Sequence, residues 1–192
     1  KILVAPFTLR DRLIEEIRSV AAAAERGEKA RVRLKLNALT DETVIEELYA
    51  ASQAGARIEI AARSLCALRP GVPGMSEGIE VRSVFGRFLE HSRLFMFEAG
   101  ERAAYYLGSA DLMPRNLDHR IEVVVPVDDP RHRDELTATF ASLMADNTGA
   151  WRLLPSGAWE LVRPSKSDRG RSAQATLGRR ARRRGSHRPL SR

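Results

Sequence analysis

The first third of the chain alternates between two hydrophobic periods. Apolar side chains recur every three or four positions over residues 9–26, which predicts a helix, whereas residues 30–36 alternate apolar and basic side chains, which predicts a strand. The expected elements are a strand, a helix, a strand, a helix and a strand, over residues 2–5, 9–26, 30–36, 41–54 and 56–63. This order predicts an α/β domain with a mixed, mostly parallel sheet that is flanked by helices.

The rest of the chain predicts shorter elements after one long loop. Residues 70–78 are too rich in proline and glycine for regular structure, so we expect a loop there. Four strands, a helix and a hairpin should follow, over residues 79–84, 92–98, 103–108, 120–127, 130–144 and 151–162. Ligands gather at the carboxyl ends of the strands in such a sheet. Asn37 and Arg63 directly follow two predicted strands, so they are candidates for a site.

Positive charge is concentrated in the last part of the chain. The sequence contains 32 Lys and Arg and 25 Asp and Glu, a net charge of +7. Ten of these basic residues and one acid lie in residues 165–192, so this tail carries +9 and residues 1–164 carry −2. The tail has almost no apolar side chains beyond Ala and Leu, which favours disorder. We therefore expect a folded domain over residues 1–163 and a disordered, arginine-rich tail over residues 164–192, whose removal leaves the fold intact.

The sequence also argues against several classes of protein. Cys66 is the single cysteine, so no disulfide forms within the chain, and a reducing cytosol fits. No base stands near Cys66, which favours a buried structural thiol. No apolar run approaches the ~20 residues that span a bilayer, so we expect a cytoplasmic protein, with peripheral attachment to a membrane left open. The chain starts on Lys1 without a Met or a leader, which favours a cut N-terminus.

Residues 90–93 combine an acid, an imidazole and a guanidinium, in Glu90, His91 and Arg93. In a strand, His91 and Arg93 would point to the same face. The guanidinium offers a fork to phosphate oxygens, and a histidine donates or accepts a proton near neutral pH. Taken alone, a histidine at the start of a strand is more often structural or exposed than functional.

Two further stretches fit an anion site. Lys35 and Asn37 lie on one face of a predicted strand as it ends. After the strand that ends at residue 108, the Ser109 hydroxyl and the backbone N–H groups of its turn are suited to phosphate oxygens, and Arg115 and Asn116 follow. The alternative for each is a solvated or structural side chain.

In combination, these stretches resemble the phospholipase D signature. That signature has His-x-Lys, an acid about five residues later, and a Gly-Ser-x-Asn turn; here His91, Glu98 and Ser109 take the matching positions. Arg93 stands in place of the Lys and Asp111 in place of the Asn. These departures argue against an ordinary phosphodiesterase.

With these departures from the signature, the sequence resembles the polyphosphate kinases whose C-terminal half contains two phospholipase D-like domains. Collinear stretches similar to the second of those domains are ILVAPF (2–7), LKLNAL (34–39), LYAASQAG (48–55), RSLCALRPGVPGMSE (63–77), RFLEHSR (87–93), GSADLMPRN (108–116) and RIEV (120–123). The likeness covers roughly residues 2–160, and the tail lies outside it.

The resemblance implies an ATP–polyphosphate phosphotransferase. Such an enzyme moves the terminal phosphate of ATP reversibly onto inorganic polyphosphate, through a phosphohistidine in the first, upstream domain, which this chain does not contain. The resemblance assigns Arg63 and His91 to the nucleotide-phosphate site, with His91 as the catalytic residue. Further expected phosphate or chain contacts are Lys35, Asn37, Arg93, Ser109, Arg115 and Asn116. Mg²⁺ would be held mainly by the upstream domain.

The expected partners follow from the same resemblance. They are ATP or ADP, inorganic polyphosphate, the upstream domains of the same enzyme, and further copies in a homo-oligomer; the isolated chain is expected to be inactive. The alternative is a stand-alone phospholipase D-like module that binds polyanions or nucleic acid without catalysis. Under either hypothesis, the arginine-rich tail predicts salt-sensitive binding of polyanions.

Overall fold

The computed structural model describes residues 1–185, with side chains through Arg183. Within this range, nine strands form one sheet in the order β1-β7-β6-β5-β2-β3-β4-β8-β9. The strands are β1 Leu3–Ala5, β2 Ala30–Leu36, β3 Arg57–Ala62, β4 Ile79–Val84, β5 Arg93–Ala99, β6 Arg102–Gly108, β7 Glu122–Pro126, β8 Ala150–Leu153 and β9 Trp159–Leu161. The helices are α1 Leu9–Glu25, α2 Glu42–Gln53, α3 Pro114–Asp118, α4 Pro130–Met144 and α5 Ala173–Gly185.

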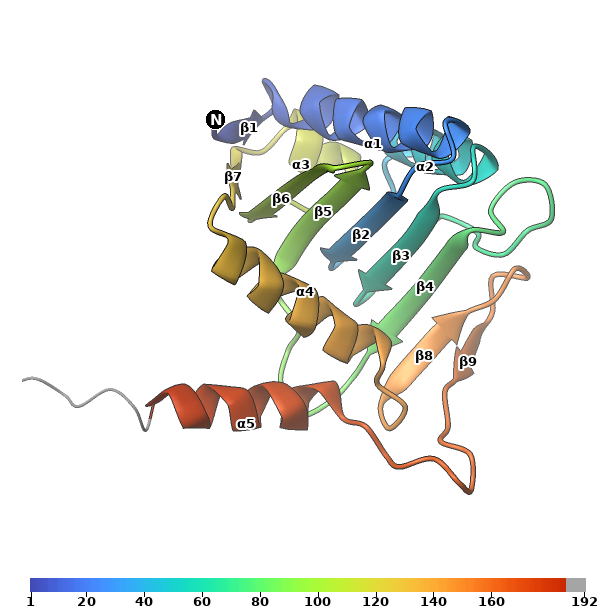
Figure 1. Cartoon of the computed structure of the whole chain (residues 1–192), viewed down its shortest axis with the longest axis vertical. Coiled ribbons are helices and arrows are strands. Elements are labelled where there is room, and N and C mark those ends of the chain that lie inside the picture. Colours follow the sequence, from blue (N-terminus) through green and yellow to red (C-terminus); the bar gives the residue numbers. More distant parts are fainter. Residues whose placement is uncertain (186–192) are drawn as a thin grey trace, which may run out of the picture.

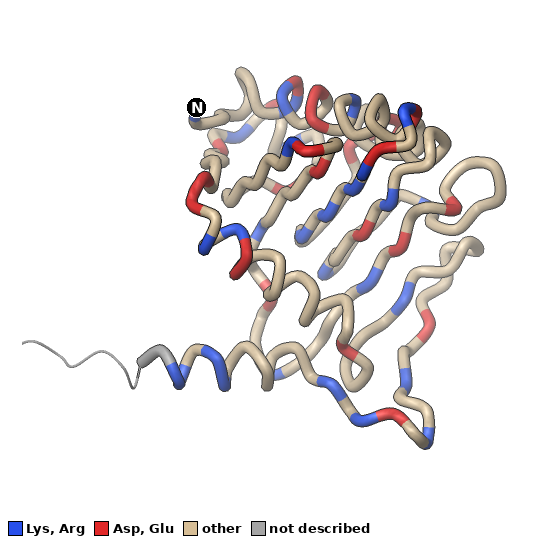
Figure 2. Tube along the Cα trace, viewed as in Figure 1, with Lys and Arg blue, Asp and Glu red and all other residues tan. Residues whose placement is uncertain are grey.

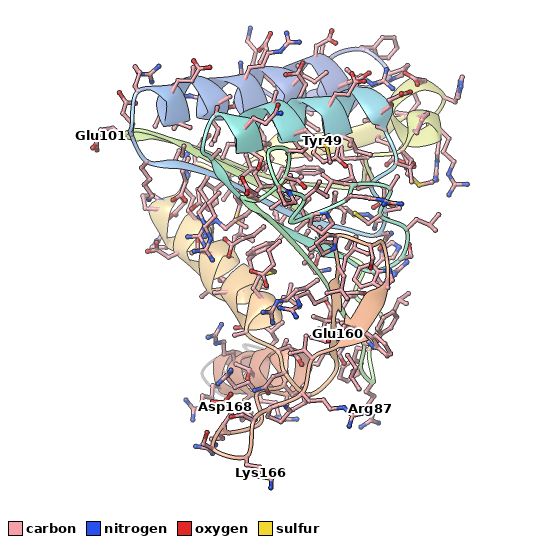
Figure 3. All side chains as sticks on the ribbon, turned by 90° about the vertical axis from the view of Figure 1, so that its right-hand side faces the viewer. Tyr49, Arg87, Glu101, Glu160, Lys166 and Asp168 are labelled. Carbon is pink, nitrogen blue, oxygen red and sulfur yellow. The ribbon has the colours of Figure 1, made fainter. Side chains whose placement is uncertain are left out.

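Helices cover both faces of the sheet. Helices α1 and α2 lie on one side and α4 on the other (Figures 1 and 3). The alternation along β3 shows how the sequence achieves this, since Ile58 and Ile60 belong to the core under α1 and α2, while Ala61 packs in the second core with Phe140 and Leu143 of α4. No helix in residues 1–185 is long and apolar enough to cross a membrane.

The expected α/β sheet is confirmed as mixed, but its parallel part is small. β2, β3 and β4 run parallel, whereas the other six of the eight neighbouring pairs of the described sheet are antiparallel. The expectation of a mostly parallel sheet is therefore wrong in that detail. Two local causes are visible: β5 and β6 form a tight hairpin through Gly100, at φ 59°, and β1 pairs antiparallel with β7 at the sheet edge rather than beside β2.

The predicted elements otherwise lie close to their expected positions. Asp41 caps α2 by accepting a hydrogen bond from the Val44 N–H, and Asp129 caps α4 through the Arg131 N–H. Gly157 supplies the positive φ that the β8–β9 turn requires. The short helix α3 was not predicted, because five residues are too few to show a helical period.

The prediction of a disordered tail is wrong for residues 173–185, which form α5. The start of this helix is held mainly by polar contacts. The buried Asp146 carboxylate accepts from the Ala173 N–H at 2.6 Å, and Asn147 exchanges hydrogen bonds with the Arg171 main chain at 2.6 and 3.0 Å. Ala173 is fully buried in the core beneath α4. The part of that prediction that concerns residues 186–192 lies outside the described residues.

We expect Asp146→Ala to destabilise the chain by about 2–4 kcal/mol, because several backbone N–H groups would lose their acceptor in a buried place. The Thr148, Gly149 and Ala173 N–H groups all donate to this carboxylate. Urea unfolding followed by circular dichroism measures the change. Asp168→Ala, at an exposed acid of the same C-terminal segment, is the control and should change stability by less than about 0.5 kcal/mol. Equal effects of the two substitutions would contradict this account of how α5 is held.

Candidate active site

Several chain segments meet at the edge of the sheet where β2 and β3 end. These strands are parallel, with Leu36 opposite Ala62, so Asn37 and Arg63 emerge from neighbouring strands. β5 is antiparallel to β2 and begins at the same edge, just after His91, and β6 ends there. The topology therefore brings the residues at the strand ends and the histidine segment together, at the lower end of the sheet in Figure 1.

Asp111, in the segment after β6, joins these strand ends. Its carboxylate accepts from the Asn37 main-chain N–H at 2.7 Å and from the Asn37 side-chain amide at 3.0 Å. Arg93 donates to it through Nη2 at 3.0 Å and through Nε at 3.3 Å. Burial alone would raise the pKa of the Asp111 carboxyl, but the hydrogen bonds from Arg93 and Asn37 outweigh burial and hold that pKa below its ordinary value.

His91 lies against the same arginine. Arg93 Nη1 is 2.8 Å from His91 Nδ1 and 3.3 Å from Nε2, and it also donates to the His91 carbonyl oxygen at 2.6 Å. Since a guanidinium only donates, the nearer nitrogen, Nδ1, acts as the acceptor. With Nδ1 as the acceptor, the proton of the neutral tautomer is assigned to Nε2, and the side chain of His91 is exposed. The ring is thus oriented by a buried cation and is accessible to a ligand.

Glu90 connects the two other basic residues of the site. Its carboxylate lies 3.3 Å from Lys35 Nζ, and its main-chain oxygen accepts from Arg63 Nη1 at 2.8 Å. Lys35 is 3% exposed, and it also donates to the Ser92 carbonyl oxygen at 3.2 Å. Burial lowers the pKa of the Lys35 ammonium, and Glu90 opposes this effect. Lys35, in β2, and Arg63, directly after β3, are therefore held beside one loop.

Three expected contacts lie further along the chain. Ser109 Oγ donates to the buried Glu122 carboxylate, and Asn116 Nδ2 donates to the same group at 2.7 Å. Arg115 is exposed, and no side-chain partner is found for it among the described residues. The sequence reasoning missed Glu122 as the group that holds this turn, although the RIEV stretch contains it.

Two other residues singled out in the sequence contribute no side chain to these contacts. Glu98 is near the end of β5 that is distant from His91, where it pairs with Lys29 and Arg33. Figure 3 shows Glu101, in the β5–β6 turn, and Arg87, in the loop before His91, at opposite ends of the molecule. Burial raises the pKa of the Cys66 thiol to about 11, which agrees with the expected structural thiol.

The fold and the edge that contains His91 and Arg93 define a phospholipase D-like α/β domain. Nuc from Salmonella typhimurium, a phospholipase D family member, has a similar fold, with a TM-score of 0.55 at 16% identity over 75% of this chain and 92% of Nuc. At that identity the likeness shows the fold alone, and it confirms the expected class.

Closer relatives identify the family. The family model described as "Polyphosphate kinase C-terminal domain 2" matches residues 2–174. A polyphosphate kinase of Streptomyces coelicolor is 50% identical over 159 residues, which are 83% of this chain and 21% of that protein. The crystal structure of polyphosphate kinase from Porphyromonas gingivalis has a TM-score of 0.91 at 32% identity, over 98% of this chain and 29% of that one. The chain belongs to the polyphosphate kinase family.

These matches also show how much of a relative the chain represents. It spans about a quarter of the length of the relatives, 21% of the S. coelicolor protein and 29% of the P. gingivalis chain. The match to the family model reaches residue 174, beyond the expected end of the likeness near residue 160. The first residues of α5 therefore lie within the region that matches the family model. This region extends past the expected domain boundary at residue 163.

We expect Asp111→Asn to lower the free energy of unfolding at pH 7 by about 3–5 kcal/mol, because it leaves Arg93 buried without its counter-charge. The folded pKa of Asp111 lies below its unfolded value. Its ionised form therefore stabilises the fold above about pH 4, and this contribution is lost as the pH falls through the lower folded value. Urea unfolding at a series of pH values should show wild type and variant converging in acid. Glu101→Gln, at an exposed acid, serves as the control. A difference that stays constant from pH 7 to pH 3 would refute the role of this charge.

Proposed function

We propose that this chain is the C-terminal part of an enzyme that transfers the terminal phosphate of ATP to inorganic polyphosphate, and does so reversibly. The family match over residues 2–174 is the observation that carries the proposal. The gathering of Arg63, Arg93 and Lys35 around His91 supports it, because cations and a proton donor at one sheet edge suit phosphoryl transfer.

Arg63 and His91 have the central roles in this proposal. One guanidinium nitrogen of Arg63 is bound to the Glu90 carbonyl oxygen, and its remaining N–H groups would hold oxygens of the β- and γ-phosphates. His91 Nε2–H would donate to the oxygen that leaves, or orient the phosphoryl group, and would take the proton back in the reverse reaction. The phosphohistidine itself belongs to the upstream domain in this proposal.

The other expected contacts differ in whether their side chains are already hydrogen-bonded within the protein. Lys35, Asn37 and Arg93 are bound to Glu90 or Asp111, so we propose that they act on phosphate mainly through their fixed positive charge and geometry. Arg115 is exposed and is proposed as a contact of the polyphosphate chain. We propose Ser109 and Asn116 as phosphate contacts through the turn that Glu122 holds.

The described residues do not fit a magnesium site of their own. No group of three His, Cys, Asp or Glu side chains within residues 1–183 is placed to bind a metal ion, and the Asp111 carboxylate is occupied by Arg93 and Asn37. We therefore assign no step to a metal here. The proposed ligands of Mg²⁺ lie in the upstream domains of the same enzyme. Those domains, ATP or ADP, polyphosphate and further copies in a homo-oligomer are the proposed partners, and the proposed location is the cytoplasm.

In the complete enzyme that contains this chain, we expect His91→Ala and Arg63→Ala to lower ATP-dependent polyphosphate synthesis by about 100-fold or more, since each removes charge or proton transfer at the phosphate. Following labelled phosphate from ATP into polyphosphate measures the rate. His132→Ala and Arg163→Ala, which truncate exposed residues of the same types elsewhere, should keep near-normal rates. Near-normal synthesis by the first two variants would overturn the site assignment.

The family match does not favour a binding module without catalysis. Binding of polyanions by the tail is compatible with the proposed enzyme, and we propose it as a part of that function. α5 begins beside the loop that contains His91, and its described side chains include Arg179, Arg180 and Arg182 and no acid (Figure 2). A polyphosphate chain that leaves the site would meet this positive helix. We propose that α5 attracts the chain electrostatically.

The triple substitution Arg179→Gln, Arg180→Gln and Arg182→Gln should weaken polyphosphate binding, and it should reduce the slope of log affinity against log salt by about 2. Fluorescence anisotropy of labelled polyphosphate over a salt series measures both quantities. A second triple variant, Arg18→Gln, Arg26→Gln and Arg152→Gln, changes the net charge equally at distant, half-exposed to exposed positions. Equal losses in the two variants would show that net charge, and not α5, determines binding.

A further inference from the structure

The loop over residues 85–92, which joins β4 to β5 and contains His91, has little apolar anchoring. Phe85, Phe88 and Leu89 are 57%, 64% and 74% exposed. A loop that leaves its large apolar side chains in solvent needs another restraint if it is to present His91 in one position. Arg63, Lys35 and Arg93 bind the main chain of residues 90–92, and hydrogen bonds from α5 provide the restraint for the exposed part before it.

Gln174, in the first turn of α5, binds the main chain of this loop on both sides of one residue. Its Oε1 accepts from the Phe88 N–H at 2.9 Å, and its Nε2 donates to the Phe88 carbonyl oxygen at 2.6 Å. Nε2 also donates to the Glu90 carboxylate at 3.0 Å. The side-chain amide thus pairs with Phe88 as a neighbouring strand would, and all three of its hydrogen bonds go to the loop.

Gly86 makes room for this amide. A Cβ at position 86 would lie 2.4 Å from Gln174 Oε1 and 2.7 Å from its Cδ, so a larger residue would push the amide away from the loop. The backbone of Gly86 is not in the left-handed region. The φ angle therefore allows alanine there, and the three nearest atoms that its Cβ would meet all belong to Gln174.

The position of Gln174 is fixed from behind. Ala173 is fully buried, and its N–H donates to Asp146 at 2.6 Å just beyond the end of α4. The Arg171 N–H donates to Asn147 Oδ1 at 2.6 Å. Gln174 therefore connects the exposed loop to the core beneath α4, because the residue before it is buried in that core.

Glu90 links this contact to both central residues of the site. Its carboxylate binds Gln174 and Lys35, and its main-chain oxygen accepts from Arg63. His91 is the next residue along the chain. A shift of Glu90 would therefore move Arg63 and His91 together.

We propose that Gln174 is a positioning residue for the active-site histidine, acting through Phe88 and Glu90. This inference rests on the proposed function of His91. Under this proposal, the first turn of α5 helps to position the phosphoryl-transfer site. Because small displacements of a catalytic group are costly in rate, the effect should fall on turnover more than on nucleotide binding.

The restraint itself is tested by hydrogen–deuterium exchange on the complete enzyme that contains this chain. In Gln174→Ala and in Gly86→Ala, peptides over residues 85–92 should exchange at least about 10-fold faster, because the Phe88 N–H loses its acceptor. Peptides from β5 and α4 should exchange as in wild type. Gln53→Ala, which removes an amide bound to the Gly74 carbonyl oxygen, is the matched control and should leave this loop unchanged. Unchanged exchange in the loop for both variants would overturn the proposal.

The consequence for catalysis is tested on the same proteins. Gln174→Ala and Gly86→Ala should each lower kcat about 10- to 100-fold with a smaller change in KM for ATP, and Gln53→Ala should match wild type. A loosened loop with normal kcat would overturn the positioning role while the proposed function stands, provided that His91→Ala is inactive. Normal activity of His91→Ala would instead overturn the proposed role of His91, and a wild-type enzyme without polyphosphate synthesis would overturn the proposed function. The two failures are therefore distinguishable.

Discussion

The buried Arg93–Asp111 ion pair is the interaction on which the active-site edge depends. Asp111 is bound at the same time to the main chain of Asn37, so one carboxylate joins the end of β2, the start of β5 and the segment after β6. Such a pair adds little net stability, since both charges lose their water, but it is costly to break from one side. Its consequence is geometric: it fixes the guanidinium against which the His91 ring lies, and hence the direction in which that ring meets a ligand.

Three cations can share this edge because two acids lie among them. Lys35 and Arg63 both contact Glu90, and Arg93 pairs with Asp111. The acids neutralise part of the charge and hold the cations in place, so little rearrangement is needed when a ligand arrives. Because cations outnumber acids here and the pairs are largely buried, the positive surplus is weakly screened by salt. An edge of this kind favours an anionic ligand, because its charges are already held in place before the ligand binds.

Hydrophobic periods predicted the elements well, because alternate side chains of a strand face opposite sides of the sheet, as Ile58 and Ile60 in one core and Ala61 in the other show in β3. The rule that ligands gather at strand ends selected Asn37 and Arg63 as candidates, and the structure places them directly after two neighbouring strands. A period contains no information on strand direction, however, so the antiparallel pairing of β1 with β7 could not be foreseen. Which acid each cation binds was equally hidden. That Glu122 would hold both Ser109 and Asn116 depends on a turn that only the folded chain brings together.

The C-terminal segment shows why composition misjudged its order. Hydrophobic burial alone would not hold it, since Ala173 is the one side chain of its described part that is fully buried in the core. Its order comes instead from two buried polar side chains, Asp146 and Asn147, which bind main-chain groups of residues 169–173. Nearly every residue type has a main-chain donor and acceptor, so the sequence of the tail contains no pattern that predicts these hydrogen bonds. Side-chain identity matters at the next position, where the amide of Gln174 takes the place of a strand partner for Phe88. The geometry of the histidine loop thus depends on a residue distant in sequence, which compositional reasoning had assigned to a different part of the molecule.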